Sequence, residues 1–188
     1  MPVIYVISHD HARFAPDRET GRTGVTHPGL PERERRYVHL SRGAPLEDVV
    51  RQILRARAPG EKIARLCLLA HGDSGQVCLP GRDEDPLQFL TLSTADVFAP
   101  LWPHFCTLRG RIEIHASGVA SDTPVLRNGR PVPGTWKGDG TGAGYRFMQR
   151  LAEVTDATVC GYIDFGLNPP RSAGRTVLVY PDGEFTRV

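Results

Sequence analysis

Two short apolar runs of the sequence end on polar side chains that can do chemistry. Residues 63–70 lead into His71 and Gly72, and residues 111–116 lead into Ser117, which is also followed by a glycine. A buried parallel strand emerges into a loop in this way, and the carboxyl ends of such strands carry the chemistry of open α/β sheets. If the two strands are neighbours, His71 and Ser117 face each other across a cleft.

A histidine beside a nucleophile is the arrangement that nucleophilic acyl transfer requires. The imidazole of His71 would take up the proton of Ser117, and backbone N–H groups near the turn at Gly72 would hold the oxyanion. A hydroxyl starts from a much higher pKa than a thiol and usually needs a third group that orients the base. Asp10 and Asp73 are the candidates for that third group. The simpler alternative is that His71 only caps local backbone.

The elements that must position these residues alternate between strand and helix, which predicts a three-layer αβα sandwich with a mostly parallel central sheet of about six strands. Strands are expected at residues 3–8, 37–40, 63–70, 77–79, 111–116 and 158–163, and a terminal hairpin at 176–180 and 184–188. Helices are expected from Pro45 to about residue 57, over 92–106 with a bend at the prolines, and over 144–154. Residues 14–34 and 121–141 have no period and are expected to be loops.

Composition restricts the classes of protein to consider. A chain of 188 residues with 40% hydrophobic content predicts one domain, residues 1–188, with a sizeable core. A formal charge of +2 with scattered basic residues gives no support to nucleic-acid binding. The first strand is too short for a signal or a membrane span, so we expect a cytoplasmic protein without membrane contact.

Metal and cofactor sites are not expected. The four cysteines show no ligand spacing and are expected to be buried free thiols. His9, Asp10 and His11 lie close together in sequence, but His27 is the only early candidate for a further ligand, so a solvated strand end is favoured. The glycine-rich residues 138–144 precede a helix without a nucleotide-binding register.

Several of these motifs together resemble a known family. The segment 66–72 with Gly75, the segment 112–120, the helix from Gly144 through Leu151, and the strand that begins at Thr158 are similar to the caspase-like (clan CD-type) fold of cysteine peptidases. The resemblance is closest to the small bacterial caspase-like (CHAT-like) domains and covers roughly residues 60–165. It implies a peptide or protein substrate.

In that family the strand-end histidine is the general base and a cysteine at the end of the next strand is the nucleophile. His71 matches the first position, but Ser117 occupies the second. Three alternatives follow: an inactive relative, a cysteine-to-serine substitution made to trap the protein, or a true serine enzyme, which we rank last. A binding module without turnover, which holds a peptide or protein in the inherited cleft, is the alternative of another class.

The resemblance also implies further site residues. Asp164 lies where caspase-like enzymes build the pocket for the residue before the scissile bond, and an acid there favours Lys or Arg. A surface aspartate at the start of a loop is the alternative. His115 lines the cleft or packs in the core. The loop 121–141 resembles the segment that is cut on activation, with Arg127 and Arg130 as cleavage sites.

Overall fold

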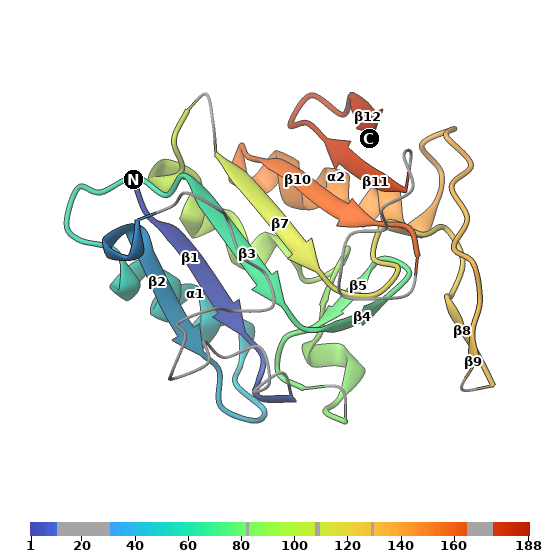
Figure 1. Ribbon diagram of the computed structural model, residues 1–188, viewed down its shortest axis with the longest axis horizontal. Helices are drawn as coiled ribbons and strands as arrows, with labels where there is room; N and C mark the ends of the chain where they lie inside the picture. Colours follow the sequence, from blue (N-terminus) through green and yellow to red (C-terminus); the bar gives the residue numbers. More distant parts are fainter. Residues whose placement is uncertain (11–30, 82, 108–109, 129, 165–174) are drawn as a thin grey trace.

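The computed structural model describes residues 1–10, 31–81, 83–107, 110–128, 130–164 and 175–188. His11, His27 and most of the expected loop 14–34 lie outside the described residues. Within them, a seven-stranded sheet with the order β12-β11-β10-β7-β3-β1-β2 forms the middle of the molecule (Figure 1). Its strands are β1 (Val3–Ile7), β2 (Arg35–His39), β3 (Arg65–Leu69), β7 (Arg111–His115), β10 (Thr158–Tyr162), β11 (Thr176–Val179) and β12 (Phe185–Arg187).

The five strands from β2 to β10 are parallel, β11 pairs with β10 in the antiparallel direction, and β12 pairs with β11 in the same manner. Shorter strands form two small sheets: β4 (His71–Asp73), β5 (Gln76–Cys78) and β6 (Leu90–Thr91) in one, β8 (Leu126–Arg127) and β9 (Arg130–Pro131) in the other. The helices are α1 (Leu46–Ala56), α2 (Ala143–Thr155) and the 3-10 helices η2 (Glu32–Glu34), η3 (Pro86–Gln88) and η4 (Ala95–His104).

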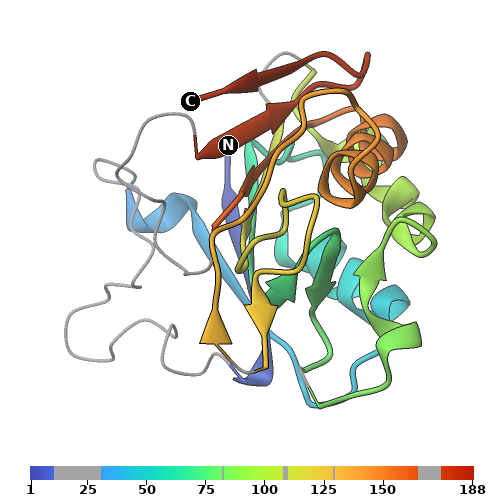
Figure 2. The ribbon, with the colours of Figure 1, turned by 90° about the vertical axis from the view of Figure 1, so that its right-hand side faces the viewer.

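The helices α1, η4 and α2 pack against one face of the large sheet (Figure 2). Apolar side chains of α1 alternate with charged ones at helical spacing, so that one stripe is buried. Acidic residues in its first turn and Arg55 in its last turn complement the helix dipole. The opposite face of the sheet is buried as well, with Tyr5 and Leu69 at 1% exposure. The sheet is therefore a central layer.

The predicted fold class, α/β with a mostly parallel central sheet, is confirmed, and both buried faces are compatible with a three-layer sandwich. Two expectations were wrong in detail. The segment expected as a bent helix over 92–106 is the 3-10 helix η4, because Pro100 and Pro103 remove the N–H groups that an α-helix needs. The loop 121–141 contains the hairpin β8–β9. No helix among the described residues is long and apolar enough to span a membrane.

Aromatic side chains connect the C-terminal hairpin to the rest of the molecule. The rings of Trp136, Tyr145 and Phe185 contact one another edge to face, with centroids 5.3 to 6.0 Å apart. The Tyr145 hydroxyl also donates a hydrogen bond to the carbonyl of Gly183 at 2.7 Å. The loop 121–141, the helix α2 and the strand β12 are therefore held at a common point.

The buried centre of β3 gives a direct test of the packing. Leu68 is fully buried against the helix-covered face. We expect Leu68→Ala to lower the free energy of unfolding by about 2–5 kcal/mol, because it removes buried apolar contacts and leaves a cavity in the core. The control is Leu87→Ala, which removes the same atoms from a side chain that is 83% exposed and should change stability by less than about 0.5 kcal/mol. Urea denaturation measures both, and equal effects would contradict the strand assignment.

Candidate functional site

The carboxyl ends of β3 and β7 lie side by side at one edge of the sheet (Figure 1). The two strands are parallel, with Leu69 paired to His115, and the amide of Ala70 donates to the carbonyl of His115 at 3.4 Å. His71 and Ser117 each follow two residues later, at equivalent positions after the two strands. The structure therefore brings the two predicted catalytic residues to adjacent strand ends, with His71 half-buried and Ser117 buried.

Gly72 is required by the close approach of these two segments. A Cβ atom at Gly72 would lie 2.7 Å from the Cβ of Ala116 and 2.8 Å from the carbonyl oxygen of Gln76. Both distances are shorter than any ordinary contact, so a side chain here would push β4 away from the end of β7. Because Gly72 has no side chain, it can pack directly against Ala116, the residue before Ser117.

Gly118 turns the chain sharply after Ser117. Its φ of +57° lies in the left-handed region that favours glycine, and a Cβ here would lie 2.5 Å from Cγ1 of Val125. The amide of Gly118 donates to the carbonyl of Asp164 at 2.8 Å. The backbone beyond Ser117 is therefore fixed to the end of the next strand, β10, and this N–H group is already paired.

The small sheet β4–β5–β6 fixes the position of His71. His71 pairs with Cys78 across the antiparallel strands β4 and β5. The turn between them is joined to the segment after β7 by two hydrogen bonds, from the Gly75 amide to the Val119 carbonyl at 3.1 Å and from the Ser74 hydroxyl to the Ser121 carbonyl at 2.6 Å. The two strand ends are therefore held together by the loops that follow them. The strand β5 overlaps the strand expected at residues 77–79, whereas β4 and β6 were not predicted.

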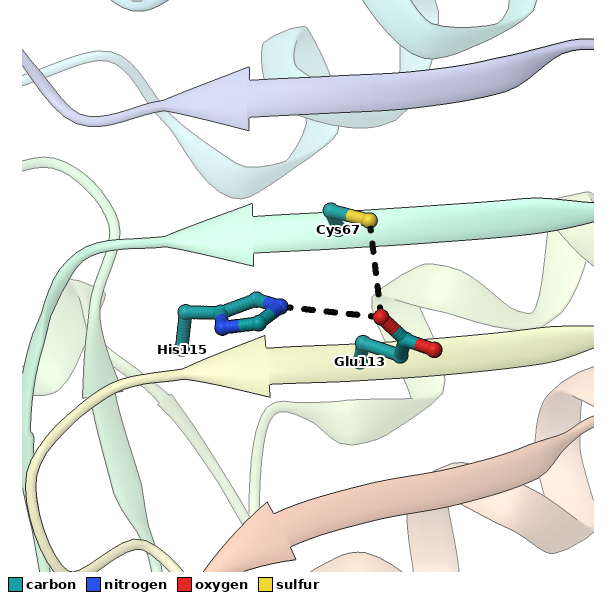
Figure 3. A group of neighbouring side chains, drawn as sticks. All are labelled: Cys67, Glu113 and His115. Atoms are coloured by element: carbon teal, nitrogen blue, oxygen red, sulfur yellow. Dashed lines mark hydrogen bonds and ion pairs between the residues drawn. The ribbon is translucent and has the colours of Figure 1, made fainter. Parts of the chain in front are cut away.

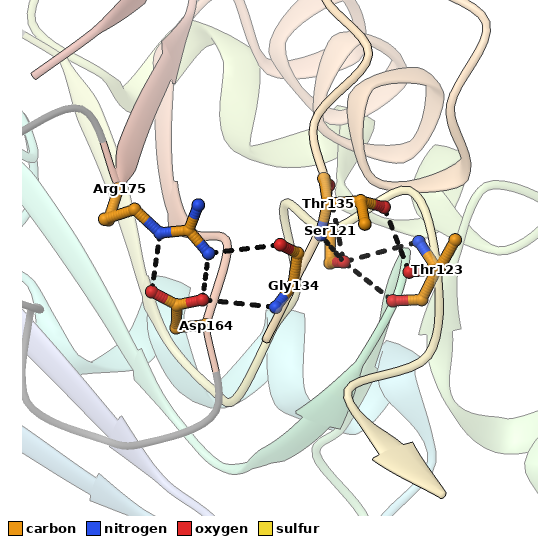
Figure 4. Close-up of polar contacts among 6 residues, drawn as sticks. All are labelled: Ser121, Thr123, Gly134, Thr135, Asp164 and Arg175. Carbon is orange, nitrogen blue, oxygen red and sulfur yellow. Dashed lines mark hydrogen bonds and ion pairs between the residues drawn. The ribbon is translucent and has the colours of Figure 1, made fainter. Parts of the chain in front are cut away.

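Asp164 follows β10 at the same edge, and its carboxylate contacts Arg175 (Figure 4). Arg175 donates from Nε to Oδ2 at 2.6 Å and from Nη2 to Oδ1, and the backbone amide of Gly134 donates to Oδ1 at 3.1 Å. Arg175, and then the Gly134 amide, hold the pKa of Asp164 below its ordinary value. The predicted role of Asp164 in binding a basic side chain stays a prediction, and a ligand cation would have to share this carboxylate with Arg175.

The base of the loop 121–141 is closed by hydrogen bonds around Ser121 (Figure 4). Its hydroxyl donates to the carbonyl of Thr123 at 2.7 Å and accepts from the amide of Thr135 at 3.0 Å. The hairpin β8–β9 at the other end of this loop is exposed, including Arg127 and Arg130. The loop is thus anchored at its base and presents its tip to solvent.

The acids proposed as orienters of His71 have partners of their own. Oδ1 of Asp10 lies 2.7 Å from Nε2 of His9. Asp73 accepts hydrogen bonds from the amides of Ser74 and Val125, both at 2.8 Å. Their role beside His71 stays a prediction.

His115 lies on the sheet face that is opposite to the helices, at 4% exposure. It is close to Glu113 on the same strand and to Cys67 on β3 (Figure 3). Its role in substrate binding also stays a prediction. Sequence reasoning missed Cys67 and Glu113, because they are 46 residues apart and only the strand pairing unites them.

Cys67 on β3 and Cys160 on β10 are buried thiols. Burial raises the pKa of Cys67 well above its ordinary value, and the carboxylate of Glu113 raises it further. The same two causes raise the pKa of Cys160 to about 12. Because the thiolate is the nucleophilic form, the raised pKa disfavours either thiol as a nucleophile. All four cysteines are free thiols, as expected from the sequence.

Comparisons with known proteins provide no family for this chain. No family model, curated protein or solved structure matches it significantly. The function must therefore be argued from the residues and their arrangement.

The ion pair between Asp164 and Arg175 predicts a pH-dependent contribution to stability. An acid whose pKa is lowered by folding stabilises the fold above its unfolded pKa of about 3.9. Asp164→Asn should therefore lower the free energy of unfolding by roughly 1 kcal/mol at pH 7, as for a partly exposed pair. The difference from the unsubstituted protein should shrink as the pH falls below about 4.

A double-mutant cycle with Arg175→Gln controls this prediction. If the two side chains stabilise the fold mainly through each other, the double variant should be no less stable than either single variant. Additive losses, or a difference that persists at low pH, would contradict the proposed origin of the effect.

Proposed function

We propose that this chain has the scaffold of a caspase-like peptidase, in which His71 occupies the general-base position and Ser117 the position of the nucleophile. One observation carries this proposal: the pairing of Leu69 with His115, which puts His71 and Ser117 at adjacent strand ends. The close packing of Gly72 against Ala116 supports it, because it holds the residue after His71 against the residue before Ser117.

With Ser117 in place of a cysteine, the chain is expected to lack cysteine-peptidase activity. A histidine activates a thiol readily, since the thiol needs only a small fall in pKa to become a nucleophile, whereas a hydroxyl needs an oriented base. The family resemblance therefore supports a peptidase scaffold disabled at its nucleophile.

A binding module without turnover is the second candidate, and two observations favour it. Ser117 is only 7% exposed, and the amide that follows it is already paired with the carbonyl of Asp164. A peptide bound at these strand ends would meet no exposed nucleophile at position 117. This candidate and the first share the same strand ends and differ in whether a thiol at position 117 restores hydrolysis.

The decisive variant is Ser117→Cys, assayed with fluorogenic peptides that carry Lys or Arg before the leaving group. We expect hydrolysis by this variant and none by the unsubstituted chain. Adding His71→Ala should lower the rate by at least about 100-fold, the usual contribution of a general base. The matched control is His39→Ala, which removes an exposed histidine at the end of β2 on the same edge of the sheet and should leave the rate unchanged.

Two outcomes would reject the peptidase scaffold. The first is an inactive Ser117→Cys variant that remains folded by circular dichroism, and the second is activity that does not depend on His71. Binding of the same peptides to the unsubstituted chain, measured by fluorescence anisotropy, would then support the binding module.

The exposed hairpin β8–β9 predicts self-cleavage in the activated variant. Arg127 and Arg130 lie on this hairpin within reach of solvent, whereas the base of the loop is closed around Ser121. Incubated Ser117→Cys protein should be cut after one of these arginines, as mass spectrometry of the products can show. Arg127→Gln with Arg130→Gln should prevent the cut, and an intact loop in an otherwise active variant would contradict this prediction.

A further inference from the structure

The face of the sheet that is opposite to the helices carries a row of side chains able to bind a metal. Strand pairing aligns Cys67 with Glu113, and Glu113 with Cys160, across the neighbouring strands β3, β7 and β10. His115 comes two residues after Glu113 and therefore stands on the same face of β7. Cys67, Glu113 and His115 are each at least 92% buried.

The three side chains point toward one another (Figure 3). Oε2 of Glu113 lies 3.9 Å from Sγ of Cys67 and 3.6 Å from Nε2 of His115. One ligand atom from each residue lies within 4.8 Å of the other two. A sulfur, a nitrogen and an oxygen donor thus converge on one point between two strands.

His115 gives an independent indication that this point binds a ligand. Its side chain is 6% exposed, and neither ring nitrogen has a hydrogen-bond partner among the residues that the structure describes. The carboxylate of Glu113 is near, but at 3.6 Å it is too distant for a hydrogen bond. A buried imidazole without a hydrogen bond is costly, and metal-binding histidines are neutral rings with an available nitrogen.

We propose that Cys67, Glu113 and His115 form a binding site for one zinc ion. Thiolate, imidazole and carboxylate are the three ligand types of protein zinc sites. Tetrahedral coordination at the usual bond lengths separates sulfur from oxygen by roughly 3.6 Å and nitrogen from oxygen by roughly 3.3 Å. The corresponding distances here are longer by only a few tenths of an ångström, so small side-chain rotations close the site.

The surroundings of the site orient the carboxylate for this role. Nε of Arg65 lies 3.3 Å and Nη1 of Arg111 lies 3.8 Å from Oε1 of Glu113, on the side away from the thiol and the imidazole. The two arginines hold one oxygen and leave Oε2 directed at the other ligands, as outer partners do in known metal sites. On binding, the bond between Sγ of Cys67 and its hydrogen is replaced by a bond to zinc, and the proton passes to solvent.

Three protein ligands leave one position of a tetrahedral ion open, and the site lies over β3 and β7 on the face of the sheet that is opposite to the helices. The ion would join the two strands whose ends carry His71 and Ser117. The site uses neither of those residues, so the peptidase assays described above do not bear on it.

The test uses the full chain, treated with a chelator and then titrated with zinc chloride against a chromophoric competitor. The unsubstituted protein should bind one equivalent of zinc. Cys67→Ser and Glu113→Gln should each weaken binding by more than about 100-fold, beyond the 10- to 100-fold typical of losing an outer partner. The matched control is Cys106→Ser, which removes a thiol outside the row and should leave the affinity unchanged.

A spectroscopic measurement keeps the proposal testable if a variant fails to fold. Cobalt bound to the unsubstituted chain should show a thiolate-to-metal charge-transfer band and the intense visible absorption of tetrahedral geometry. Cobalt without the thiolate band would place the metal elsewhere and overturn the proposal. So would the absence of stoichiometric zinc binding, or equal binding by folded Cys67→Ser protein.

Discussion

The in-register parallel pairing of β3 with β7 is the constraint on which the rest of the site depends. It aligns five consecutive residue pairs, from Arg65 with Arg111 to Leu69 with His115. The same alignment pairs Cys67 with Glu113 and leaves His71 and Ser117 each two residues beyond the last pair. Because side chains alternate along a strand, a slip of one residue would turn Glu113 and His115 into the helix-covered core and separate both pairs.

The two faces of the sheet are buried by different means. On the helix side the central strands contribute apolar side chains only, among them Leu66, Leu68 and Ile114. On the opposite side a buried carboxylate stands between two arginines, a thiol and an imidazole. Such a polar group is costly to bury unless it is paired, so this face requires its partners in defined places, whereas the helix face requires only volume and shape.

The sequence predicts best those features whose pattern lies in consecutive residues. The helix α1 and the hairpin of β11 and β12 each have a pattern in consecutive residues, and both were predicted to within one or two residues of their ends. The strand ends with His71 and Ser117 were also found, because an apolar run that stops at a polar residue and glycine is a local pattern. In contrast, Asp164 has its partner eleven residues away beyond a segment without pattern, and the row of Cys67 and Glu113 exists only through strand order. Side chains that only strand pairing brings together have no characteristic spacing in the sequence, so the sequence does not predict their contact.

Three aromatic rings that meet at Trp136 connect the last strand to the segment that follows Ser117. Phe185 on β12 stacks edge-on against an indole that belongs to the segment following Ser117, and that indole also touches α2 through Tyr145. Any polypeptide that displaced β12 from the outer edge of the sheet would uncover this indole and release one support of the segment. The edge strand thus helps to fix the segment that follows Ser117, through a contact made far from the strand ends.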